Sequence, residues 1–156
     1  MEEWAHLEKN ILNWAKGNNI VPDVSKLSQG LECAAHVGDI ISRHQKGQSI
    51  INAIGDVYIS LVLQAYLSYS CATKCREINA SVEKRKTTEE QIADLLLDVA
   101  MLVEGVQAET HTVGYIGNAL SGLDHICEAL DLSLEVCINM AYYNRVRNTV
   151  SWIDED

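Results

Sequence analysis

The chain has 156 residues, 47% of them hydrophobic, and a formal net charge of -10 at pH 7. This length and composition favour a single folded domain, residues 1–156, and argue against a disordered chain. The negative charge argues against direct binding of duplex nucleic acid, because phosphate contacts need clustered Lys and Arg. The one basic run, Lys84 to Lys86, is flanked by acids and is interpreted as a solvated segment.

The cysteines and the apolar segments indicate the compartment. The five cysteines are an odd number without paired zinc-type spacing, and the first residues are acidic where a secretory signal is basic. The longest apolar stretch, residues 57–67, is interrupted by Ser60 and Gln64 and is too short to span a bilayer. We expect a cytoplasmic protein with no membrane contact.

The hydrophobic periodicity predicts an all-α fold, because the chain has one proline and no alternating strand pattern. A first helix is predicted over residues 2–16 and ends at Gly17. A second helix follows, with Asp23 or Ser25 as its N-cap, and is interrupted near its end by Gly47. A third helix opens at Ser49.

Polar residues recur every four positions along this third helix: Asn52, Asp56, Ser60 and Gln64. A surface helix usually carries Lys and Glu on such a face. The pattern therefore indicates either a partly enclosed polar seam or a helix contact with satisfied polar groups.

The second half of the chain also reads as helical. A weaker helix is predicted over residues 67–86. Residues 87–90, Thr-Thr-Glu-Glu, are a good helix start, with a hydroxyl cap and acids in the first turn, and the helix continues to Gly105. Residues 109–122 are either a loop or a closely packed helix. The last helices are predicted over residues 123–130 and 133–147, and Trp152 and Ile153 are expected to pack back or onto a partner.

Two helical segments carry the strongest functional pattern. His36 lies one turn from Asp39, and Asn52 lies one turn from Asp56. Four ligands on facing helices could bind a divalent cation such as Mg²⁺, and the bound cation could in turn bind a phosphate group. An ordinary hydrogen-bonded helix histidine is the competing interpretation of His36.

Several runs together resemble MazG-like proteins, a family of all-α nucleoside triphosphate pyrophosphohydrolases that includes short bacteriophage members. The runs are Ile11 to Ala15, Asn19 to Val21, Lys46 and Gly47, Ile54 to Tyr58, Leu130 to Glu135, and Ala141 and Tyr142. The resemblance covers about residues 10–66 and 123–150. Residues 67–122 would then be a helical insertion relative to the short family members.

The resemblance implies a Mg²⁺-dependent hydrolase, with Mn²⁺ as an alternative metal, that cuts a nucleoside triphosphate to the monophosphate and pyrophosphate. It implies Asp39, Asp56 and His36 as catalytic residues, and as metal ligands it implies Asp39, Asp56, His36 and Asn52. Glu32, one turn before His36, is a further candidate ligand. Asn144, Arg145 and Arg147 would contact phosphates.

The departures from the family pattern leave other functions open. Of the expected acids only Asp56 is unchanged. Asp39 is an aspartate where the family has a glutamate. The other expected acids are replaced by Ala35, His36 and Asn52. Fewer charges should weaken metal binding. A nucleotide-sequestering protein, such as a phage counter-defence protein, and a protein-protein interaction module are therefore alternatives. The acids Glu90, Asp94 and Asp98 either complete the site or form a solvated helix edge.

The resemblance also implies a homodimer or a homotetramer, since the family assembles through helix packing. A half-polar helical bundle of this size suits such an assembly.

Overall fold

A computed structural model describes residues 2–78 and 87–154 of the chain. The described residues form seven helices and no strands, so the predicted all-α class is confirmed. The helices are α1 (Glu2–Gly17), α2 (Lys26–Gln45), α3 (Ile51–Leu67), α4 (Ala72–Ile78), α5 (Thr88–Gln107), α6 (Val113–Ala129) and α7 (Leu134–Asp154). The basic run at residues 84–86 and the side chains of Trp152 and Ile153 lie outside the part that is described.

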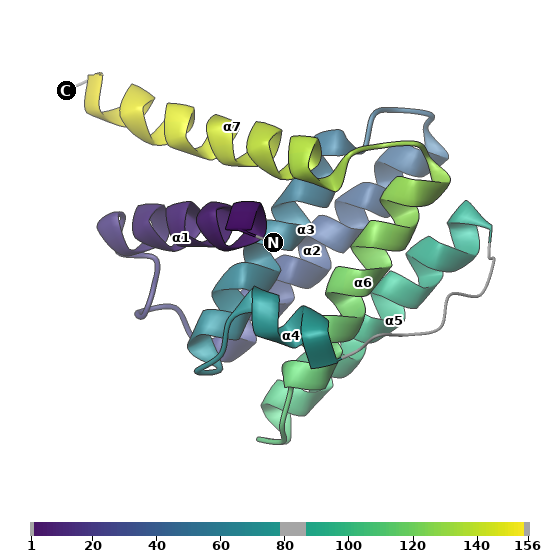
Figure 1. Ribbon diagram of the computed structural model, residues 1–156, viewed down its shortest axis with the longest axis horizontal. Helices are drawn as coiled ribbons and strands as arrows, with labels where there is room; N and C mark the ends of the chain where they lie inside the picture. Colours follow the sequence, from purple (N-terminus) through teal and green to yellow (C-terminus); the bar gives the residue numbers. More distant parts are fainter. Residues whose placement is uncertain (1, 79–86, 155–156) are drawn as a thin grey trace.

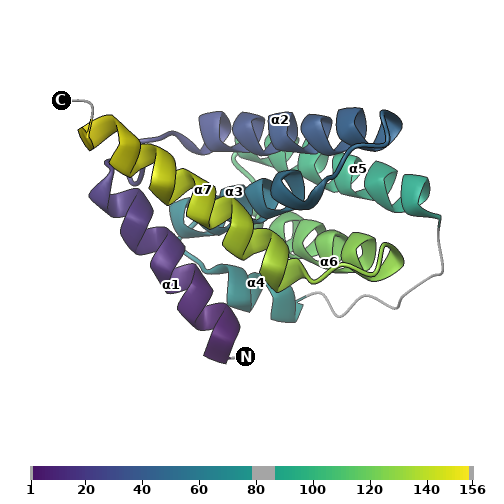
Figure 2. The same ribbon diagram turned by 90° about the horizontal axis from the view of Figure 1, so that it is seen from above.

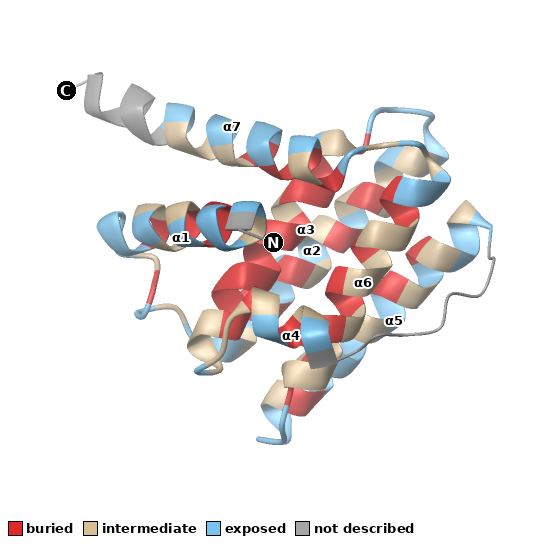
Figure 3. Cartoon of the chain, viewed as in Figure 1, coloured by how far each residue is buried: buried red, intermediate tan, exposed pale blue. Residues whose placement is uncertain are grey.

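Helix α3 is the centre of the fold. It packs against α2, α6 and α7 and also touches α1 and α4, and residues 57–65 are buried without a break. A helix that is apolar on nearly all sides has to be surrounded by other helices. Figure 3 shows this burial, with the red residues gathered on the inner helices and the exposed ones on the outer faces.

The helices cross in two directions. In Figure 1, α7 runs above α1 on one side of the molecule, while α5 and α6 lie on the other side. Figure 2 shows α2, α3, α5 and α6 roughly aligned, with α1 and α7 running obliquely to them. Helix α7 thus passes over α3, and this crossing positions the polar residues described below.

Local signals in the sequence set several helix ends. The Ser25 hydroxyl accepts a hydrogen bond from Ser28 N at 3.0 Å and caps α2. The predicted hydroxyl cap of α5 is Thr87, which forms a reciprocal capping box with Glu90. The third helix begins at Ile51, slightly later than expected, and Ser49 Oγ accepts a 3.4 Å hydrogen bond from Ile51 N.

The region around residues 67–122 packs into the same body. Helix α5 packs against α2 and α6, and α4 packs mainly against α6. The buried carboxylate of Glu8 in α1 fixes the start of α4, because it accepts hydrogen bonds from Ala72 N at 2.5 Å and from Thr73 Oγ1 at 3.1 Å. This carboxylate replaces a local cap for a helix of only seven residues.

Candidate functional site

A polar cluster lies where α7 crosses α2 and α3. Arg145 of α7 donates from Nε to Asp56 Oδ1 of α3 at 3.2 Å, and its Nη2 lies 3.2 Å from the same oxygen. Nη2 also lies 3.4 Å from His36 Nε2 of α2. These three residues and Glu32 are called the Arg145 cluster below. The consecutive helices α2 and α3 and the distant helix α7 therefore each contribute a charged or titratable group.

Close packing at Gly55 allows this convergence. A Cβ atom at Gly55 would lie 2.2 Å from the carbonyl oxygen of Cys137 and 2.6 Å from Ala141 Cβ, both on α7. No side chain fits in that space, so glycine lets the backbones of α3 and α7 approach. The next residue along α3 is Asp56, and one turn beyond Ala141 along α7 is Arg145. The glycine of the predicted Gly-Asp pattern thus has a packing role.

Glu32 extends the cluster toward solvent. Its Oε1 lies 3.6 Å from His36 Nε2, one helical turn away. The contact with His36 lowers the pKa of the Glu32 carboxyl, and the positive charge of Arg145 lowers it further against the opposing effect of partial burial. Glu32 is therefore held in its ionised form.

The cluster is only partly accessible. The exposed fractions of the side chains are 18% for Arg145, 26% for Asp56 and 24% for His36. The Arg145 guanidinium also lies over the ring of Trp14 in α1, 5.8 Å from the ring centroid. Charges in such a half-buried place interact more strongly than fully solvated ones.

The other predicted site residues lie at the edge of the cluster or outside it. Asn144 Nδ2 donates to Asn52 Oδ1 at 3.2 Å, which joins α7 to the start of α3. Asp39 instead accepts two hydrogen bonds from Arg43 on its own helix, at 3.2 and 3.1 Å. Arg147 is exposed.

The geometry does not fit a resident Mg²⁺ ion. The described residues contain no group of three or more His, Cys, Asp or Glu side chains that could hold a metal. Asp56 and Asp39, the two expected acidic ligands, each face an arginine. Mg²⁺ requires several oxygen ligands in near-octahedral geometry, and these two separately paired acids do not supply them.

The predicted polar seam on α3 is present, and it becomes more buried along the helix. Asn52 is exposed, Asp56 is partly buried, and Ser60 and Gln64 are fully buried. Gln64 Nε2 donates to Lys26 O at 3.2 Å. The seam therefore connects the Arg145 cluster to the interior, as an enclosed seam would.

A thiol beside the cluster does not supply a nucleophile. Cys33 follows Glu32 but is fully buried, and burial together with the Glu32 charge raises the pKa of its thiol to about 12. A thiol with this pKa stays protonated at neutral pH, whereas nucleophilic catalysis needs the thiolate. His44, interpreted from sequence as ordinary, lies 3.1 Å from Glu89 and links α2 to α5.

Sequence reasoning missed two partners of the predicted residues. The ion pair of Asp39 with Arg43 was visible in the sequence as an acid and a base four residues apart on one helix. The position of Trp14 over Arg145 had no local signal, because the two residues lie at opposite ends of the chain.

Comparisons with models of known protein families, with curated protein sequences and with solved structures find no match to this chain. In the described part of the chain, none of the helices combines the length and the apolar character needed to cross a membrane.

Proposed function

We propose that this chain is a nucleotide-binding protein with a MazG-like arrangement of helices, in which Arg145 takes the place of a metal ion beside the acids. One observation carries the proposal. His36, Asp56 and Arg145 come from three separate helices, and the Arg145 guanidinium lies within 3.4 Å of both of the other side chains. The resemblance predicted two of these as metal ligands and the third as a phosphate contact, so their meeting is what a shared ligand site requires.

Arginine is the group in this cluster that is suited to phosphate. Its planar guanidinium presents several N–H donors and binds phosphate oxygens with charge-assisted hydrogen bonds. Trp14 beside it offers an aromatic face to a base. An incoming phosphate competes with Asp56 for the guanidinium, so the expected affinity is moderate.

Metal-dependent hydrolysis is the second candidate and uses the same residues. It is supported by the resemblance and by the retention of Asp39 and Asp56. It requires both carboxylates to leave their arginine partners before a metal can bind. Nucleotide binding without turnover does not require Asp39 to leave its arginine partner. We therefore rank nucleotide binding first.

The test is isothermal titration with nucleoside mono-, di- and triphosphates, in EDTA, Mg²⁺ and Mn²⁺, followed by chromatography of each mixture. Sequestration predicts saturable binding in EDTA with the nucleotide intact. Metal-dependent formation of monophosphate and pyrophosphate would establish the hydrolase instead. No binding by any nucleotide would refute both and favour a protein partner.

The chain offers a matched control for the central arginine. Arg76 also pairs with an aspartate, Asp124, and also lies over a tryptophan, Trp4, at 4.4 Å, and its side chain is 22% exposed. Arg145→Gln should abolish nucleotide binding at the Arg145 cluster, seen in NMR as loss of the nucleotide-induced shift of the Trp14 indole, and Arg76→Gln should leave this binding unchanged. Equal losses in both variants would show a general effect on the fold.

The surface of α7 supports self-association. Val136, Met140 and Tyr143 are 52%, 45% and 65% exposed, and they line a groove of about 520 Å³ on this helix. Their spacing of four and three residues places them on one side of the helix, as in paired helices. We infer that a second copy of α7 covers this stripe in a homodimer.

A further inference from the structure

A second cleft lies between the α1–α2 connection and the end of α3. It has a volume of about 530 Å³, within the range of small-molecule sites, and belongs to neither the Arg145 cluster nor the groove on α7. Val24 and Leu67 give it apolar walls, and Tyr66, Tyr69 and Lys26 line the rest of its surface together with small residues.

The cleft combines aromatic rings with positive charge. Lys26 Nζ lies 5.5 Å from the centroid of the Tyr69 ring, and Lys16 Nζ lies 4.8 Å from that of Tyr66. Residues 57–73, which provide the α3 side, contain no charged residue, and Asp23 is the one acid in the connection on the other side. In a chain with a net charge of -10, the ammonium group of Lys26 in the cleft and that of Lys16 against the Tyr66 ring favour an anion with an aromatic body.

Tyr69 occupies a position that packing does not explain. Its side chain is 95% exposed and its backbone has φ of 58°. The left-handed conformation costs a residue with a Cβ about 1–2 kcal/mol, which is why glycine usually occupies this place after a helix. The turn closes through a 2.9 Å hydrogen bond from Ser70 N to Ala65 O.

At the other helix ends that the structure describes, glycine or a polar residue takes this place. The same turn follows α1, α2, α5 and α6, each with a backbone hydrogen bond that spans five residues. The residues with positive φ in those turns are Asn19, Gly47, Glu109 and Asp131. Asn, Gly and Asp tolerate this conformation best. A tyrosine in this conformation destabilises the fold, and its exposed ring gains little packing in return. Contact of the ring with a ligand in the adjacent cleft would explain why a tyrosine is there.

We propose that this cleft binds a small aromatic anion of the nucleotide class. The aromatic ring of the ligand stacks on Tyr66 and Tyr69, and the ammonium group of Lys26 pairs with its phosphate. This site is separate from the Arg145 cluster and does not depend on the function proposed for it.

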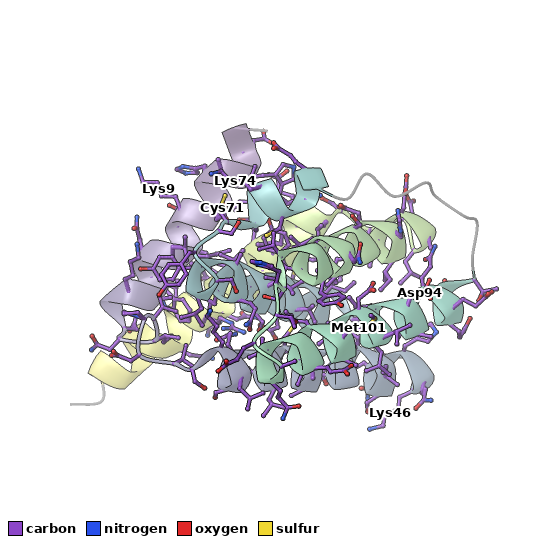
Figure 4. All side chains as sticks on the ribbon, turned by 90° about the horizontal axis from the view of Figure 1, so that it is seen from below. Lys9, Lys46, Cys71, Lys74, Asp94 and Met101 are labelled. Carbon is purple, nitrogen blue, oxygen red and sulfur yellow. The ribbon has the colours of Figure 1, made fainter. Side chains whose placement is uncertain are left out.

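The test is a titration with adenosine 5′-monophosphate followed by NMR of the tyrosine rings. Resonances of Tyr66 and Tyr69 should shift, and affinity should fall about tenfold or more in Tyr69→Gly and in Lys26→Met, because stacking on a base contributes about 1–3 kcal/mol. Lys46→Met is the control, since Lys46 lies at the other end of α2 (Figure 4).

Tyr69→Gly also separates function from folding. Glycine suits φ of 58°, so this variant should unfold at the same or a higher temperature than the wild type while it loses the ligand. Adenosine, which has the ring without the charge, should bind more weakly than the monophosphate.

Four results would overturn the proposal: unshifted tyrosine rings, equal shifts with inorganic phosphate alone, adenosine binding as tightly as the monophosphate, or wild-type affinity in Tyr69→Gly. Arg145→Gln should leave the shifts at Tyr66 and Tyr69 intact. Loss of these shifts in that variant would also contradict the proposal, because it would show one site where two are expected.

Discussion

Replacing Gly55 with alanine tests the helix crossing that forms the Arg145 cluster. The added Cβ would lie 2.2 Å from the Cys137 carbonyl oxygen, whereas ordinary contacts begin at 3.4 Å. The helices would have to separate by roughly 1.2 Å at this point. Overpacking typically costs about 1–3 kcal/mol, and the upper end applies because the obstacle is backbone. Alanine regains about 1 kcal/mol of helix propensity, which leaves a net loss of about 2 kcal/mol.

Gly38→Ala is the matched control for this substitution. Gly38 lies inside α2 and has no atom within 4 Å of the position of an added Cβ. This change should therefore stabilise the protein by about 0.5–1 kcal/mol. Urea unfolding of both variants gives the two values. If Gly55→Ala unfolds at the same urea concentration as Gly38→Ala, the close crossing of α3 and α7 is wrong.

Three further changes probe other parts of the fold. Glu8→Ala removes the buried carboxylate that holds the start of α4. This change should lower the free energy of unfolding by about 2 kcal/mol, which corresponds to a fall in melting temperature of about 4–8 °C. An unchanged melting temperature would contradict this capping role. Glu32 has a pKa below its ordinary value of 4.5. The ionised carboxylate therefore stabilises the folded protein above that pH, and this stabilisation disappears as the pH falls through the lowered pKa. Urea midpoints of Glu32→Gln and wild type should differ slightly at pH 7 and coincide in acid. Met140→Glu should convert a dimer to a monomer in light scattering, whereas Leu97→Glu, at an exposed position on α5, should not; a dimer in both variants would exclude the α7 interface.

The elements set by local chemistry were predictable from the sequence. Ser25 and Thr87 cap helices through hydrogen bonds to residues three positions away. Each cap and its hydrogen-bond partner therefore lie within one short stretch of sequence. The segment 109–122 could not be resolved in the same way, because its glycines fit a loop as well as a helix. The structure makes residues 113–122 part of α6 and leaves 109–112 as a connection; Gly117 is buried in this helix, and a Cβ at Gly122 would touch Leu95 of α5. Tertiary packing therefore decides this helix.

The same limit applies to the site. Helical spacing places His36 near Asp39 and Asn52 near Asp56, but it cannot show which cation neutralises the acids. Arg145 lies 89 residues from Asp56 in sequence, and only the crossing at α7 shows that a guanidinium takes this place. The helices and the approach of α2, α3 and α7 to one another could therefore be inferred from the sequence. The pairing of Arg145 with Asp56 could not.

Substitution of Asp56 separates the two candidate functions by the sign of its effect. If Arg145 binds phosphate directly, Asp56→Asn removes a competing negative charge that lies 3.2 Å from the guanidinium. Nucleotide affinity should then rise, by about tenfold for a gain of about 1.4 kcal/mol. If Asp56 is instead a metal ligand of a hydrolase, the same change should weaken metal-dependent binding and abolish pyrophosphate release. Titration of the variant in EDTA and in Mg²⁺ measures both, and weaker binding in EDTA would refute direct capture of phosphate by Arg145.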